Sequence, residues 1–119
     1  MKRYLFVISR SPYRSSHAME QLEAAMVAAV FDGQVSILFR DEGVWNLQEN
    51  QSGEASQQKT LSKVLAALPS YEIEDLYACQ DSLVTRQVQM DKALTVKTLS
   101  LAEQSELIAA SDAVVTGQP

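Results

Sequence analysis

Short, mainly apolar segments recur along the chain, and most are separated by stretches long enough to hold a helix. Residues 4–8, 35–39 and 73–79 are rich in aliphatic and aromatic side chains, and shorter segments follow at 94–99 and 113–115. Apolar runs without polar alternation are typical of strands that are covered on both faces. Connections of this length allow consecutive strands to run parallel. The pattern predicts an α/β fold with a mainly parallel five-stranded sheet and helices on both faces.

Capping residues and apolar spacing predict the helices between these strands. Residues 61–68 carry leucine and valine at i, i+3, i+4 and i+7 and stop at Pro69. A short helix is expected at 81–87, and Ser100 and Glu103 form a capping box that opens a helix to about residue 110. The polar segment 41–53 is predicted to be a long loop.

The apolar spacing of residues 17–31 predicts a helix that is apolar around most of its circumference. It follows Ser15 or Ser16 as the N-cap and ends before Asp32-Gly33, with glycine at the expected C-terminal position. A helix of this kind is either deep in a domain or covered by a partner. In a chain of 119 residues, cover by a partner subunit is a substantial possibility.

Length and composition restrict the class of protein. The 119 residues suit a single domain spanning 1–119. Ten basic against fifteen acidic residues, a net charge of −5, argue against direct nucleic-acid binding. One cysteine and one histidine exclude an intramolecular disulfide and a structural zinc site, and we expect no metal and no cofactor. The apolar runs are too short for a membrane span, so we expect a cytoplasmic protein without a membrane partner.

Cys79 is the sharpest candidate for chemistry. It ends the third predicted strand, and strand ends of this kind form the functional edge of a parallel sheet. The free N–H groups of the helix that follows would favour its thiolate, whereas Glu74, Asp75 and Asp81 would oppose it. The alternative is that Cys79 is a small, buried hydrophobic residue. The sequence leaves both interpretations open.

Two predicted loops, residues 9–16 and 41–47, reach the same edge of the sheet as Cys79. Residues 9–16 contain serines and two arginines, which suit either an anion site or, as we favour, a polar connection that caps a helix. Tyr13 and Trp45 lie in loops, where aromatic side chains either anchor an interface or fold over the core. His17 has no sequence neighbour that completes a triad, so it is interpreted as a helix-start residue.

Three blocks of sequence resemble one known family. They are Lys2-Arg3-Tyr4-Leu5-Phe6-Val7-Ile8-Ser9 followed by Pro12-Tyr13, Phe39-Arg40-Asp41-Glu42-Gly43-Val44-Trp45-Asn46-Leu47, and Tyr71-Glu72-Ile73-Glu74-Asp75-Leu76-Tyr77-Ala78-Cys79 with Ser82-Leu83. Together and in this order, they resemble the DsrE/DsrF-like sulfur-relay family, and within it the TusC (DsrF) type. The resemblance extends over nearly the whole chain.

The resemblance implies an accessory subunit of a sulfurtransferase complex. Its partners would be TusD/DsrE-like and TusB/DsrH-like subunits in a cytoplasmic heterohexamer, with TusA-like and TusE-like relay proteins acting indirectly. The complex would pass persulfide sulfur toward 2-thiolation of the tRNA wobble uridine, or would serve oxidative sulfur metabolism of the DsrEFH type. Cys79 matches the strand-end position that carries sulfur in the DsrE-like subunit, and the resemblance therefore implies it as the candidate catalytic residue. Residues expected at the interface or at this edge are Ser11, Pro12, Tyr13, Val44 and Trp45.

Overall fold

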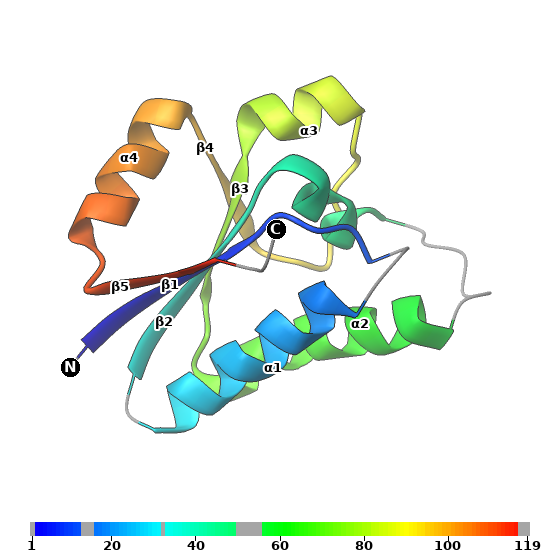
Figure 1. Cartoon of the computed structure of the whole chain (residues 1–119). Helices are drawn as coiled ribbons and strands as arrows, with labels where there is room; N and C mark the ends of the chain where they lie inside the picture. Colours follow the sequence, from blue (N-terminus) through cyan, green and yellow to red (C-terminus); the bar gives the residue numbers. More distant parts are fainter. Residues whose placement is uncertain (1, 13–15, 32, 50–55, 117–119) are drawn as a thin grey trace.

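The computed structural model describes residues 2–12, 16–31, 33–49 and 56–116, without the side chains of 56–60 and 62. Its strands form one sheet in the order β4-β3-β2-β1-β5, and every neighbouring pair is parallel (Figure 1). This confirms the predicted parallel five-stranded sheet. The strands are β1 (Lys2–Ile8), β2 (Gly33–Phe39), β3 (Asp75–Cys79), β4 (Val96–Leu99) and β5 (Ala113–Thr116).

Helices cover both faces of the sheet, as the sequence predicts. The helices α1 (His17–Val30) and α2 (Ser56–Ala67) lie together against one face, and α4 (Leu101–Ala110) lies against the other (Figure 1). The short helix α3 (Gln80–Arg86) follows β3 directly. Among the described residues, no helix has both the length and the apolar character required to cross a membrane.

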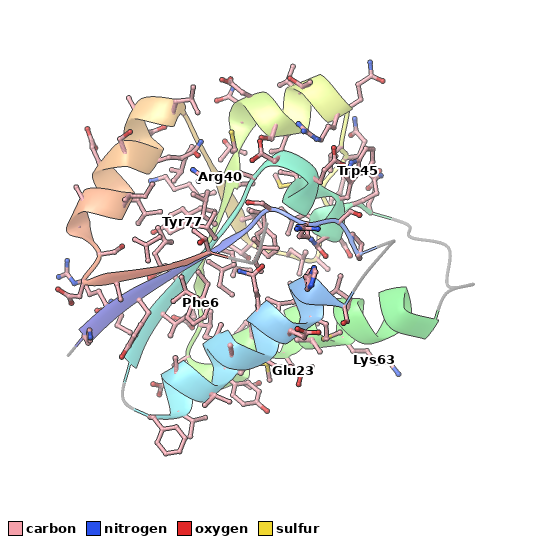
Figure 2. All side chains as sticks on the ribbon, viewed as in Figure 1. Phe6, Glu23, Arg40, Trp45, Lys63 and Tyr77 are labelled. Atoms are coloured by element: carbon pink, nitrogen blue, oxygen red, sulfur yellow. The ribbon has the colours of Figure 1, made fainter. Side chains whose placement is uncertain are left out.

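The larger core lies between the sheet and the α1 and α2 helices. Alternate residues of β1 and β2, such as Phe6 and Ile37, point to this side and pack against Leu22 of α1 and Leu65 of α2. The opposite side has a much smaller core, in which Leu5, Val7 and Leu38 meet two residues of α4. Figure 2 labels Phe6 on the first side and Tyr77 on the second.

The ends of α1 differ from the prediction in their detail. Ser16 is the N-cap, but its hydroxyl donates to Glu20 and makes no capping hydrogen bond. The helix ends at Val30. Gly33 does not cap it: it is the first residue of β2, and its φ is not positive. The prediction of a glycine C-cap was therefore wrong. A Cβ at Gly33 would lie 2.8 Å from the Ala28 carbonyl oxygen, so close packing requires glycine there.

The segment after β2 was predicted as a loop, and that prediction was wrong for its first half. Residues Asp41–Leu47 form a 3-10 helix, η1. Tertiary contacts hold this turn: the Asn46 amide donates to the carbonyls of Arg10 and Gly43, both at 2.8 Å. A Cβ at Gly43 would collide with the Ile8 carbonyl, so only glycine lets η1 approach β1 so closely. Such contacts leave no periodic apolar pattern in the sequence.

The end of α2 and the start of α4 agree closely with the sequence, whereas α2 begins at Ser56, five residues before the first apolar position of the predicted pattern. Helix α2 ends at Ala67, and Pro69 lies within the following 3-10 turn, η2 (Leu68–Tyr71). The predicted capping box is complete: Ser100 accepts a hydrogen bond from the Glu103 N–H, while the Glu103 carboxylate accepts from the Ser100 N–H. The start of α4 is therefore fixed by its own sequence.

Candidate functional site

Cys79 is the last residue of β3 and the N-cap of α3. Because β1, β2 and β3 are parallel, Ile8, Phe39 and Cys79 all end at the same edge of the sheet. The chain leaves β3 into α3, whose Leu83 joins the larger core, and leaves β4 into α4 on the other face. Neighbouring strands whose connections diverge in this way open a crevice between them, where α/β proteins bind ligands.

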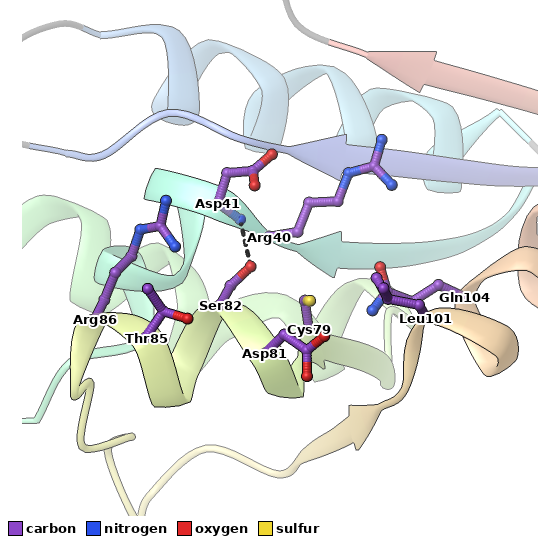
Figure 3. A pocket seen from close by; sticks show the side chains of 9 residues that line it. All are labelled: Arg40, Asp41, Cys79, Asp81, Ser82, Thr85, Arg86, Leu101 and Gln104. Carbon is purple, nitrogen blue, oxygen red and sulfur yellow. Dashed lines mark hydrogen bonds between the residues drawn. The ribbon is translucent and has the colours of Figure 1, made fainter.

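An open pocket of about 360 Å³ occupies this crevice (Figure 3). Its walls come from the start of η1, from α3 and from the first turn of α4. Only 4% of the Cys79 surface is exposed, so the thiol lies in the wall of the pocket and does not project from it. The lining residues are Arg40, Asp41, Cys79, Asp81, Ser82, Thr85, Arg86, Leu101 and Gln104.

Hydrogen bonds around the sulfur favour its thiolate form. Burial acts to raise the pKa of Cys79, but hydrogen bonds from the side chains of Ser82 and Gln104 and from the backbone of Ser82 and Asp81 outweigh it. The net result is a pKa below the usual value for cysteine. A lowered pKa increases the thiolate fraction at neutral pH, and the thiolate is the nucleophilic form.

The expected effect of the acidic neighbours on the Cys79 pKa was wrong. Glu74, Asp75 and Asp81 were expected to oppose the thiolate, yet no carboxylate contributes to the pKa shift of Cys79. Asp81 is exposed at the start of α3, and its backbone acts to lower the pKa of Cys79. The shift of the Cys79 pKa therefore comes from burial and hydrogen bonding and not from these negative charges.

Asp41 links η1 to the Cys79 pocket. Its φ of 54° lies in the left-handed region, which costs free energy for a residue with a side chain. In this conformation its N–H donates to the Ser82 hydroxyl oxygen at 2.9 Å, as Figure 3 shows. The neighbouring Glu42 pairs with Arg86 of α3 at 3.2 Å. The turn after β2 is thus held against α3, directly beside the sulfur.

The predicted edge residues have different surroundings. Val44 is fully buried in the larger core. Trp45 is half-buried and packs against that core, which agrees with the second alternative given for it, that its side chain folds over the core. Pro12 is buried and Ser11 is half-buried. Tyr13 lies outside the described residues, as does part of the predicted anion-binding segment 9–16. Of the four edge residues that the structure describes, none lines the Cys79 pocket.

Sequence reasoning missed Gln104 as a site residue. Gln104 is only 2% exposed, and its Nε2 donates to the Leu99 carbonyl at 3.2 Å. It precedes Leu107 and Ile108 by three and four residues, so it lies on the stripe of α4 that faces the sheet. A polar residue on an apolar stripe was the available signal. The sequence does not show that Gln104 lies beside Cys79, because the two residues are far apart along the chain.

The outer side of α1 is unusually apolar. Val27, Val30 and Phe31 are 56%, 66% and 79% exposed, whereas Leu22 on the inner side is fully buried.

His17 is the first residue of this helix, as predicted. Among the described residues, no three His, Cys, Asp or Glu side chains gather as possible metal ligands.

Comparison with known proteins finds a family and relatives that agree with one another. The DsrE/DsrF-like family matches residues 2–116. The chain is 30% identical to the intracellular sulfur oxidation protein DsrF of Allochromatium vinosum, an alignment that covers 96% of this chain and 95% of that protein. It is 36% identical to a protein TusC homolog of Pseudomonas aeruginosa, covering 98% of this chain and 99% of that protein.

A solved structure supports the fold independently of sequence. The crystal structure of the ychN protein from E. coli superposes with a TM-score of 0.74 at 16% identity, and the match covers 98% of this chain and 99% of that one. At this identity the likeness concerns the fold alone. The family match over 2–116 and the two full-length relatives concern the sequence itself, and by them the chain belongs to the DsrE/DsrF-like family.

Proposed function

We propose that this chain is a TusC/DsrF-like subunit of a cytoplasmic sulfur-relay complex that supports persulfide transfer. One observation carries the proposal: in a DsrE/DsrF-like chain, the sole cysteine lines the pocket at the carboxyl edge of the sheet. The proposed partners are a TusD/DsrE-like and a TusB/DsrH-like subunit. Relay proteins of the TusA and TusE type would act through the assembled complex.

The proposed end product is 2-thiouridine at the tRNA wobble position. One relative is named DsrF and the other a TusC homolog, so oxidative sulfur metabolism is the alternative role for the same subunit. Deleting the gene and measuring 2-thiouridine by nucleoside mass spectrometry distinguishes the two roles. We expect the modification to be lost and to return when the gene is supplied on a plasmid. Normal 2-thiouridine with impaired sulfur oxidation would instead support the DsrEFH-type role.

Assembly with partner subunits is supported by the outer side of α1. Val27, Val30 and Phe31 expose large apolar surfaces, which are typical of protein–protein contacts. Co-expression with the two partner subunits and size-exclusion chromatography test the assembly. The variant Phe31→Ser should weaken co-elution, whereas Val84→Ser, which removes a 69% exposed valine from α3, should not. A chain that stays monomeric with every partner would contradict the proposal.

A second candidate role is that Cys79 itself carries the sulfur. The hydrogen bonds that lower its pKa favour this role, because a persulfide donor is attacked by the thiolate. The Cys79 sulfur would attack the outer sulfur of a donor persulfide, R–S–SH. A new S–S bond forms at Cys79 while the donor S–S bond breaks, and the electron pair leaves on the donor thiolate. The hydrogen stays on the transferred sulfur.

Mass spectrometry separates the carrier role from a purely accessory one. After exposure to a persulfide donor, the wild-type chain should gain the mass of one sulfur atom, and Cys79→Ser should gain none. Because the chain has one cysteine, the added sulfur has a single candidate site. Full relay activity of the Cys79→Ser complex would refute the carrier role and leave the subunit role intact.

A further inference from the structure

Gln104 is a polar side chain in a position that packing alone would give to an apolar one. It is 2% exposed, it lies in the wall of the Cys79 pocket, and its Oε1 has no hydrogen-bond partner among the described residues. A buried carbonyl oxygen without a partner is costly, and leucine or methionine would fill similar space without that cost. The position of Gln104 beside the sulfur distinguishes it from Gln21, another buried glutamine, which does not line the pocket.

The orientation of the amide follows from its anchor on β4. Nε2 donates to the Leu99 carbonyl at 3.2 Å. Turning the amide over would set Oε1 against that carbonyl, two acceptors facing each other, so the nitrogen is fixed on this side. Nε2 has a second hydrogen, and Gln104 lines the pocket wall beside Cys79, where its side chain acts to lower the pKa of the thiol. Gln104 thus connects the end of β4 to the end of β3.

Ser82 approaches the sulfur from the opposite side, and Figure 3 shows Cys79 between Ser82 and Gln104. The Ser82 oxygen accepts the Asp41 N–H at 2.9 Å, so this bond does not use the hydroxyl hydrogen, and the Ser82 side chain acts to lower the pKa of Cys79. Ser82 is 6% exposed, so both side-chain donors are buried with the thiol. Buried donors that are already anchored need little reorganisation when negative charge forms on the sulfur.

Charged groups in the pocket carry both signs. Arg40 and Asp41 come from the end of β2 and the start of η1, and Asp81 and Arg86 come from α3. Arg86 is already paired with Glu42. Among the described residues, β4 and α4 contribute no charged side chain to the pocket wall. Neither sign of charge therefore dominates the pocket wall around the sulfur.

We propose that Gln104 is a positioning residue that, together with the Ser82 hydroxyl, holds the Cys79 sulfur in place as a thiolate. This goes beyond the proposed sulfur relay and does not depend on it, because it concerns the resting state of the sulfur. Asp41 contributes indirectly by orienting Ser82.

The test is the alkylation rate of Cys79 by iodoacetamide as a function of pH in the full-length chain. The midpoint of this profile reports the stability of the thiolate, and the plateau at high pH reports access to the sulfur. Removing a donor destabilises the anion, so Gln104→Leu and Ser82→Ala should each move the midpoint up by about one pH unit, a roughly tenfold smaller thiolate fraction below it.

Gln21→Leu is the matched control. Gln21 is also a buried glutamine whose Nε2 donates to a strand carbonyl, that of Val7 at 2.9 Å, and whose Oε1 is unpaired, but it does not line the pocket. Its midpoint should equal that of the wild type. If Gln104→Leu does not fold, Gln104→Met and Ser82→Ala provide the same measurement.

Two results would overturn the proposal. The first is an unchanged midpoint in a folded Gln104 variant, even if the plateau changes, since a purely structural role alters access alone. The second is an equal shift in Gln21→Leu. Neither result depends on relay activity, so failure of this proposal and failure of the proposed function are distinguishable.

Discussion

The two faces of the sheet are packed very differently. On the α1 and α2 face, residues from β1, β2, β3 and both helices form one extensive core. On the α4 face, Leu5, Val7 and Leu38 are the fully packed residues, and only Leu107 and Ile108 cover them from α4. The first face supplies most of the buried apolar area, while the second holds the helix whose first turn forms one wall of the Cys79 pocket.

This difference separates stability from chemistry within one small domain. Stabilisation by apolar burial scales with the area removed from water, so the α1 face should dominate the free energy of unfolding. Segments with few buried contacts open more readily than the rest of a domain. The α4 face should therefore respond to change more locally, and changes there should reach Cys79.

The largest effect is expected on the α1 face. Leu22 is fully buried in the larger core, so Leu22→Ala should lower the free energy of unfolding by about 3–5 kcal/mol through lost burial and a residual cavity. Urea denaturation measures it. Glu23→Ala, at the exposed neighbouring position, should change stability by less than about 0.5 kcal/mol. Similar effects of the two variants would contradict the assignment of this face as the main core.

The equivalent substitution on the α4 face should lower the free energy of unfolding by a smaller amount. Leu107 is only half-buried, so Leu107→Ala should lower the free energy of unfolding by about 1–2 kcal/mol. Hydrogen exchange should show faster exchange in α4 with little change in α1. A loss as large as that of Leu22→Ala would show that the two faces are equally important for stability.

The capping box tests how α4 affects the cysteine. Ser100→Ala removes the side-chain acceptor of the Glu103 N–H and should destabilise α4 by about 1 kcal/mol. Because Leu101 and Gln104 of that turn line the pocket, Cys79 should be alkylated faster at its high-pH plateau. Ala109→Ser, an exposed change in the last turn of α4, serves as the control. An unchanged plateau would mean that α4 does not restrict access to the sulfur.

The smallest expected effect is pH-dependent. Hydrogen bonds from the backbone and side chain of Ser100 lower the pKa of Glu103 below its ordinary 4.5. The folded-state pKa is depressed, so its stabilisation is present above 4.5 and is lost as the pH falls through the lowered value. Hydrogen exchange in α4 should accelerate there, relative to Glu103→Gln measured at the same pH. Equal pH dependence in both proteins would exclude this carboxylate as the cause.

Much of the fold could be predicted because its signals are local. The apolar runs, Pro69 and the Ser100–Glu103 box each depend on residues within one or two turns, and the helix boundaries follow from them. The 3-10 helix η1 could not be predicted in the same way. It depends on Asn46 reaching the Arg10 carbonyl and on Gly43 packing against Ile8, contacts between residues far apart in sequence.

The sequence by itself determined the parallel α/β architecture and put Cys79 at the end of a strand, because side-chain periodicity and strand order along the chain are sufficient for both. Only the tertiary structure decided the state of that cysteine. Its thiolate is favoured by Ser82 on α3 and Gln104 on α4, with Asp41 from η1 holding Ser82. Hydrogen bonds act only over about 3 Å, so groups from three separate segments affect the sulfur only after the chain has folded.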